Sequence, residues 1–269
     1  MLLAKAAAFI RRDFLTEISY KSAFLMNLIG IFFSSLTFFF IAKLFGSAAA
    51  PHLQEYGGDY FPFVLIGIAF STFLGVGLGT SASALRQEQM LGTLEAMLIT
   101  PTRASSIVIY LTLWNFIYSS FNILVYLIIG RLVFGIRFSL SQPLLILVIL
   151  FLSILCFSSL GIISSCFVMV FKRGDPVNWI VSSSFDLLGG VYYPITILPG
   201  PLQAISHLLP ITYALKALRG VFLAGYSLTE VKTEVLALLA FAVVLFPLAL
   251  LLFEFSLQWA KRDGSLSQY

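Results

Sequence analysis

The sequence predicts an all-α, polytopic membrane protein with six transmembrane helices. An interfacial helix precedes the first span, a charged cytoplasmic helix separates the second from the third, and a re-entrant pair of short outer helices precedes the last. Three observations support this: 59% of the residues are hydrophobic and 10% are charged, the mean hydropathy is +1.00, and several apolar runs reach the roughly 20 residues that cross a bilayer. A soluble domain carries roughly a quarter charged residues, far more than the 10% found here, so a soluble globular protein is excluded.

Residues 1–22 are expected to form the interfacial helix. Apolar side chains recur at helical spacing, at Leu3, Ala7, Ile10, Phe14 and Ile18, and the charged residues Lys5, Arg11, Arg12, Asp13 and Glu17 lie elsewhere around the helical wheel. This pattern is typical of a helix that lies in the inner membrane interface. The alternative is a cytoplasmic extension of the first span.

Six runs are predicted to span the membrane, at residues 23–45, 60–84, 105–133, 143–171, 177–197 and 234–257. The first begins too late and is too long for a cleaved signal peptide, so we expect it to be retained. The second carries a small-residue face that allows close helix packing, at Gly67, Gly75, Gly77 and Gly79. Cys156 and Cys166 share the fourth, about 15 Å apart along the helix, so they cannot pair with each other.

Helix breakers crowd the chain after the fifth run, at Gly189, Gly190, Pro194, Pro199, Gly200, Pro201 and Pro210. They forbid a continuous helix from 177 to 222. The apolar pieces 202–209 and 211–223 are each too short to cross, so residues 198–230 are predicted to form an outer re-entrant segment. Tyrosines of an interfacial aromatic belt fit the same region, at Tyr192, Tyr193, Tyr213 and Tyr226.

Lysine and arginine indicate the orientation, because cytoplasmic loops are enriched in positive charge. With the N-terminus inside, the inner segments hold Lys5, Arg11, Arg12, Lys21, Arg86, Arg103, Lys172, Arg173, Lys261 and Arg262. The outer segments hold the smaller set of Lys43, Arg131, Arg137, Lys216, Arg219 and Lys232. We therefore expect a multi-pass cell-membrane protein with both termini cytoplasmic, whose net charge of +4 serves membrane anchoring and not nucleic-acid binding.

The motifs of common active sites are missing from the sequence. It has no G-x-x-x-x-G-K-[S/T] phosphate loop, no H-E-x-x-H zinc motif and no G-x-S-x-G nucleophile elbow. With only His52 and His207, a histidine metal site is not expected either, so we predict no enzyme activity, metal or cofactor. Asp186 in the fifth run is a candidate polar-pathway residue, and a hydrogen bond to a hydroxyl of its own or a neighbouring helix explains it equally well.

Residues 85–103 form the longest polar segment predicted to face the cytoplasm. Leucines recur at helical spacing at Leu91, Leu94 and Leu98, among polar Arg86, Glu88 and Glu95. The pattern indicates a short amphipathic helix parallel to the membrane, which Thr100-Pro101 ends. An interfacial linker without a binding partner is the alternative.

Two separated motifs resemble those of type 2 ATP-binding-cassette (ABC) exporter permeases. The first is Glu88-x-x-x-Gly92-Thr93-Leu94-Glu95-x-x-Leu98-x-Thr100-Pro101. The second begins with Gly190-Val-Tyr-Tyr-Pro194 and continues through Leu198-Pro199 and Leu209-Pro210-Ile-Thr-Tyr213 to Arg219. With six spans and this chain length, the resemblance covers the whole protein. Gln89-Met90 stand where this family often has an arginine, and Arg86 is the candidate substitute.

The resemblance implies a permease subunit that pairs with a second copy of itself and docks a cytoplasmic ABC ATPase subunit, which binds the ATP. A coupling helix would receive the ATPase through Arg86, Glu88, Gly92, Thr93, Leu94, Glu95, Leu98, Thr100 and Pro101. An outer gate would contain Tyr192, Tyr193, Pro194, Pro199, Pro210, Tyr213 and Arg219. The implied function is ATP-driven export of a hydrophobic drug, lipid or glycan-like substrate from the cytoplasm or inner leaflet.

Two other classes of protein stay open. A stand-alone secondary transporter or channel would need paired charges near the membrane midplane or an inverted repeat, and neither is clear in the sequence. A membrane assembly factor or intramembrane enzyme would need catalytic residues that the motifs do not supply.

Overall fold

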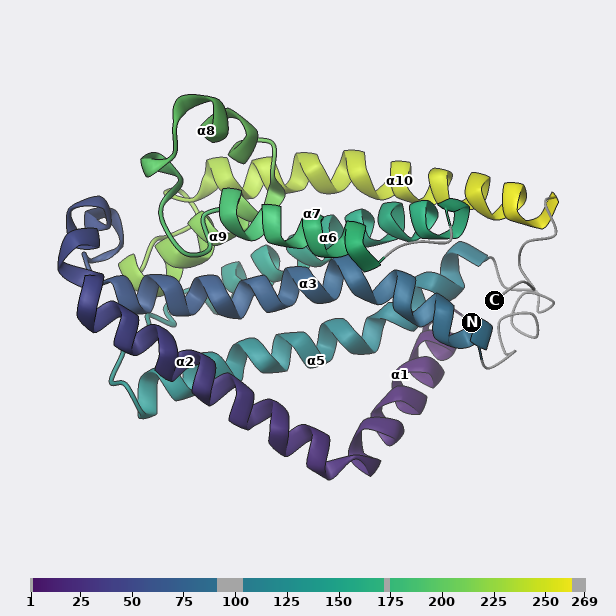
Figure 1. Cartoon of the computed structure of the whole chain (residues 1–269), viewed down its shortest axis with the longest axis horizontal. Helices are drawn as coiled ribbons and strands as arrows, with labels where there is room; N and C mark the ends of the chain where they lie inside the picture. Colours follow the sequence, from purple (N-terminus) through teal and green to yellow (C-terminus); the bar gives the residue numbers. More distant parts are fainter. Residues whose placement is uncertain (1, 91–103, 172–174, 263–269) are drawn as a thin grey trace.

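The computed structural model describes residues 2–90, 104–171 and 175–262, and they form helices and connecting loops without a β-strand. Long helices run along the molecule (Figure 1): α2 (Lys21–Ala49), α3 (Tyr60–Met90), α5 (Ala104–Leu132), α6 (Pro143–Phe171) and α10 (Lys232–Arg262). In the part of the chain that the structure describes, these five are long and apolar enough to cross a membrane. The all-α, polytopic membrane fold is confirmed.

The segment predicted as the fifth span is a shorter helix. The sequence predicts a span over 177–197, whereas α7 (Asp175–Leu188) has 14 residues, about 21 Å at the rise of an α-helix. It ends because Gly190 adopts a φ of 81°, in the left-handed region that favours glycine. Helix α7 is antiparallel to the preceding α6, and its C-terminal end points toward α8 (Gly200–Ser206) (Figure 1).

The bundle has two distinct ends (Figure 1). One, called here the α1 end, holds α1 (Leu2–Ser19), the last turns of α3 and the last turns of α10. The opposite end, called the α9 end, holds α8, α9 (Pro210–Arg219), the π-helical turn η4 (Gly220–Ala224) and three short 3₁₀ turns, η1 (Ala50–His52), η2 (Gln54–Tyr56) and η3 (Ile195–Ile197).

A break at Tyr20, with φ −104° and ψ 61°, separates α1 from α2. The two helices form a V in Figure 1, and α1 leans back onto the N-terminal half of α5. Aromatic pairs hold this contact, with ring centroids 5.6 Å apart for Phe9 and Tyr110 and 5.4 Å apart for Phe14 and Trp114. The amphipathic N-terminal segment is therefore a helix of its own that contacts the bundle.

The central helix is α3. Within its apolar stretch 72% of the residues are buried, against 11% in that of α2, which lies at the periphery. Phe70 and Phe73 of α3 meet Phe157 of α6 edge to face and are fully buried. Gly77 allows this approach, since a Cβ there would lie 2.5 Å from the Cβ of Phe157.

The predicted small-residue face of α3 is only partly used for packing. Gly67 and Gly77 touch neighbouring segments, whereas nothing lies within 4 Å of a Cβ built on Gly75 or Gly79. In α6, Cys156 and Cys166 are both free and buried, as expected.

Candidate functional site

Helix α9 is buried between other helices at the α9 end of the bundle. It packs against α3, α6 and α10, and of its ten residues only Tyr213 and Lys216 are not buried. Pro210 occupies its first turn, where the missing N–H costs no hydrogen bond. The sequence predicts short helices in this region, and α8 and α9 are such helices, each too short to cross a bilayer.

Arg219, at the C-terminal end of α9, anchors the helix to two other segments. Its Nε donates to the carbonyl of Phe63 at 3.1 Å, and its two terminal nitrogens donate to the carbonyls of Gly190 at 2.8 Å and Val191 at 2.9 Å. Phe63 belongs to α3, and the other two residues follow α7. One guanidinium therefore ties α9, α3 and the turn after α7 together, and these four residues are called here the Arg219 anchor.

The Arg219 side chain is buried in this anchor, 3.4 Å above the centroid of the Phe63 ring. Burial lowers the pKa of Arg219, and nearby Tyr56 and Tyr60 oppose that shift. The group stays charged at neutral pH, because guanidinium deprotonates only in strongly basic solution. A buried charge is tolerated where hydrogen bonds replace its water, and the three carbonyls do so here.

Gly67 makes room for the anchor. A Cβ at this position would lie 2.1 Å from the carbonyl oxygen of Val191 and 2.7 Å from a terminal nitrogen of Arg219. These two atoms are hydrogen-bonded to each other. Only glycine lets α3 approach the Arg219–Val191 bond this closely.

An ion pair joins α9 to the start of α10. Lys216 Nζ lies 2.8 Å from Glu234 Oε1, and the side chains are 48% and 8% exposed, respectively. The hydrogen bond to Glu234 is the main reason why the pKa of Lys216 is raised, and burial opposes it. Because the carboxylate is the buried partner, it depends on this lysine for its compensation.

Side-chain hydrogen bonds to the backbone hold the loops before α9. Tyr213 donates its hydroxyl hydrogen to the carbonyl of His207 at 2.9 Å, and Thr212 donates to the carbonyl of Ser206 at 2.8 Å. Gln203 of α8 donates to the carbonyl of Leu198 at 2.7 Å. These bonds close α8 and its flanking turns onto the first turn of α9.

A cavity of about 470 Å³ lies beside α9. Of the predicted outer-gate residues, the structure brings Pro194, Tyr213 and Arg219 to its wall. The others lie elsewhere: Tyr192 stacks on Phe38 of α2 with centroids 5.8 Å apart, Tyr193 is half-buried in the turn after α7, Pro199 precedes α8, and Pro210 is buried at the start of α9.

Asp186 of α7 has a partner on a neighbouring helix. Ser71 of α3 donates a hydrogen bond of 2.6 Å to its Oδ1. The structure therefore contains one of the two arrangements expected from the sequence, a carboxylate satisfied by a hydroxyl of an adjacent helix.

The predicted coupling helix lies mostly outside the described residues. Arg86 and Glu88 fall in the last turns of α3, at the α1 end. The remaining predicted residues are not among those described: Gly92, Thr93, Leu94, Glu95, Leu98, Thr100 and Pro101. Their role stays a prediction.

Comparison with known proteins decides the family. The model of the ABC-2 type transporter family matches residues 6–223, more than three quarters of the chain. The chain belongs to this family. Similar proteins are the inner membrane transport permease YadH of Escherichia coli K12 and that of Shigella flexneri, each 25% identical over 195 residues, which cover 70% of this chain and 73% of the relative.

Membership makes the chain a membrane permease subunit of an ABC transporter. In this ABC-2 permease, sequence reasoning placed Arg219 at the α9 end through its motif but missed its partners. It also missed the pair of Lys216 and Glu234, whose members belong to different helices. Of the residues that build this site, only Gly67 could be recognised in the sequence as a packing position, because it is a small residue inside a predicted span.

Proposed function

We propose that this ABC-2 permease is the transmembrane subunit of an ATP-driven exporter. It would sit in the cell membrane with both termini cytoplasmic and move a hydrophobic drug, lipid or glycan-like substrate out of the cytoplasm or inner leaflet. The observation that carries the proposal is the buried position of α9, held by the Arg219 anchor at the end of the bundle opposite α1. In the proposed orientation this is the outer end, and α9 is a closed outer gate.

The energy would come from a cytoplasmic ABC ATPase subunit that binds ATP, while this chain binds no cofactor. The ATPase would dock on residues 85–103, a segment that begins in the last turns of α3. Because α3 is one helix of 31 residues from Tyr60 to Met90, about 45 Å long, a push at its cytoplasmic end would move Phe63 and Gly67 at its other end. Closure of the ATPase would thereby act on the Arg219 anchor as a rigid-body change.

A second identical subunit is part of the proposal. The apolar stretch of α2 is only 11% buried within one chain, so most of its surface is available to lipid or to a partner copy. A pathway between two copies would also explain why Asp186 is engaged by Ser71 and not directed into a channel of its own.

The proposal is tested by ATP hydrolysis in nanodiscs after co-expression with a candidate ABC ATPase. Glu95→Arg and Gly92→Pro are expected to abolish the dependence of hydrolysis on the permease while the permease stays folded. Lys232→Glu, a charge reversal at the opposite end, is the matched control and should leave hydrolysis unchanged.

Normal transport and hydrolysis by both coupling variants would contradict the docking role of residues 85–103. If no ATPase co-purifies with the chain under any condition, the alternative of a stand-alone secondary transporter or channel is favoured instead.

A further inference from the structure

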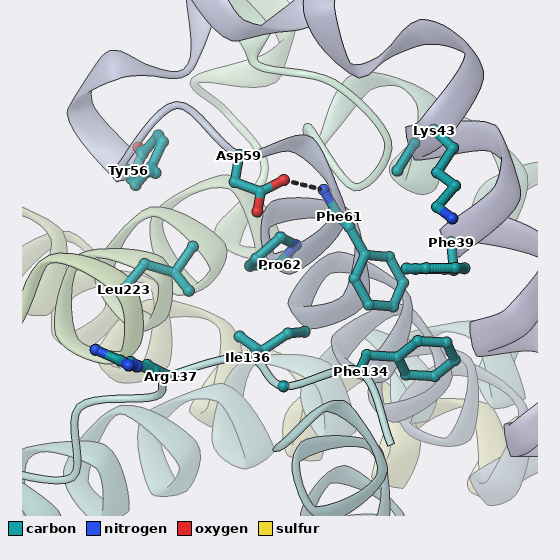
Figure 2. Close-up of a pocket in the computed structure, with 12 residues that line it drawn as sticks. Phe39, Lys43, Tyr56, Asp59, Phe61, Pro62, Phe134, Ile136, Arg137 and Leu223 are labelled. Carbon is teal, nitrogen blue, oxygen red and sulfur yellow. Dashed lines mark hydrogen bonds between the residues drawn. The ribbon is translucent and has the colours of Figure 1, made fainter. Parts of the chain in front are cut away.

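A second cavity, of about 360 Å³, opens at the α9 end on the side of α2 (Figure 2). Its wall comes from five places: the end of α2, Tyr56 of η2, the residues from Asp59 to the start of α3, the loop 133–142 between α5 and α6, and η4. Its volume falls within the roughly 300–1,000 Å³ of small-molecule sites. The proposed export function leaves this cavity without a role.

One side of the cavity is an aromatic wall, formed by Phe39, Phe61 and Phe134. The ring centroids of Phe39 lie 5.3 Å from Phe61 and 4.8 Å from Phe134, and the last two lie 4.9 Å apart. Figure 2 shows the three rings gathered below Lys43. Such mutually packed rings form a preorganised apolar surface.

Charged groups of both signs complete the cavity. Lys43 and Arg137 lie on opposite sides of it, and the Asp59 carboxylate lies between them (Figure 2). Asp59 accepts one long hydrogen bond of 3.4 Å, from the N–H of Phe61. Among residues 2–90, 104–171 and 175–262, no ion pair within 4 Å joins Lys43 or Arg137 to a carboxylate. The cavity therefore offers two cations for an anion and one carboxylate for a cation.

The cavity lies where the lipid-facing surface ends. Large apolar side chains on the last turns of α2, at the end of α5 and on the first residue after it are exposed, namely Phe40, Leu44, Phe45, Leu132 and Val133. Such a band faces hydrocarbon, and lysine or arginine beside it reaches the headgroup level. A ligand in this cavity can therefore keep its acyl chains on α2 and α5.

We propose that the cavity binds the headgroup of a zwitterionic phospholipid. The phosphate would lie against Lys43, with Arg137 attracting it from the opposite side of the cavity, and the ammonium would lie against Asp59, which accepts its hydrogen bonds. The aromatic wall would pack against the glycerol and the first methylenes. A purely anionic headgroup would leave the Asp59 charge opposed by like charge, so the cavity selects the zwitterion.

Native mass spectrometry of the purified full-length chain tests this assignment, after exchange into micelles that contain phosphatidylethanolamine and phosphatidylglycerol in equal amounts. The wild type should retain phosphatidylethanolamine preferentially. Asp59→Asn should lower the ratio of retained ethanolamine to glycerol lipid about tenfold, because one charged hydrogen-bond partner is removed. The double variant Lys43→Gln, Arg137→Gln should lose both lipids.

All three substituted residues are exposed, so the variants should melt like the wild type, and Lys232→Gln at the same end is the control that should keep both lipids. Unchanged lipid retention by the double variant, or an unchanged ratio in Asp59→Asn, would overturn the proposal. Displacement of the lipid by an equal concentration of soluble glycerophosphoethanolamine would overturn the assignment to a lipid, since the headgroup alone would then suffice.

Discussion

Gly67→Ala is the sharpest test of the Arg219 anchor. The added Cβ would lie 2.1 Å from the carbonyl oxygen of Val191, so the turn after α7 or α3 itself must shift by roughly 1 Å to restore a van der Waals contact. Overpacking of this kind costs about 1–3 kcal/mol. The shift also weakens the hydrogen bond from Arg219 to Val191, and bonds of charged groups contribute about 1.5–3 kcal/mol.

Alanine offsets part of this cost, since its helix propensity exceeds that of glycine by about 1 kcal/mol. The net expectation is a destabilisation of about 3 kcal/mol, which corresponds to a fall in Tm of roughly 6–12 °C. Gly75→Ala on the same helix is the matched control, because nothing lies within 4 Å of its Cβ.

Thermal unfolding of both variants in the same detergent, followed by tryptophan fluorescence, measures the difference. Gly67→Ala should unfold well below the wild type, while Gly75→Ala should match it within a few degrees. If Gly67→Ala unfolds at or above the temperature of Gly75→Ala, the close approach of α3 to the anchor is refuted.

Three further variants probe other contacts. Lys216→Met should destabilise by about 1–3 kcal/mol, because it leaves the buried Glu234 carboxylate unpaired, whereas Glu234→Gln should cost less since Lys216 is half exposed; equal losses of Tm would contradict this asymmetry. Asn27 of α2 donates to Asn122 of α5 at 2.9 Å, and a double-mutant cycle to alanine should give a coupling of about 0.6–1.7 kcal/mol, with zero coupling refuting the pair. Cys156 and Cys166 should resist maleimide in the folded protein and react after denaturation, which mass spectrometry of the labelled chain detects.

The long spans could be predicted because hydrocarbon imposes a strong and local rule. The predicted span 143–171 coincides with α6, since Pro143 opens an apolar run that continues to Phe171 without a charged residue or a further proline. The same rule made the predicted span 177–197 too long, because α7 ends at Leu188. Apolar residues continue from Val191 to Ile197, but two glycines precede them, and Gly190 turns the chain away from the helix.

The contacts of the α9 end could not be predicted in the same way, because they join residues far apart in the sequence. Arg219 and Phe63 are separated by 156 positions. No local sequence pattern predicts that the Phe63 carbonyl, inside a span, accepts a hydrogen bond from the Arg219 guanidinium. The burial of Glu234 is equally non-local, since it depends on how α9 packs against the start of α10. A motif indicates that Arg219 matters, whereas only the fold shows what it touches.

The chemistry of the Arg219 anchor is compatible with the proposed outer gate, which would have to open and close. Apolar side chains of α9 are also buried in the core, among them Ile211, Ala214 and Leu218, so its release would require repacking, which a dense core resists. At its C-terminal end the guanidinium meets three backbone carbonyls on two segments, and water could replace those hydrogen bonds one at a time. Because α3 supplies one carbonyl and the glycine beside the bond, small movements of α3 change both the strength and the clearance of the anchor. We infer that α3, joining the two ends of the bundle as one helix, is the element through which an event at the α1 end reaches α9.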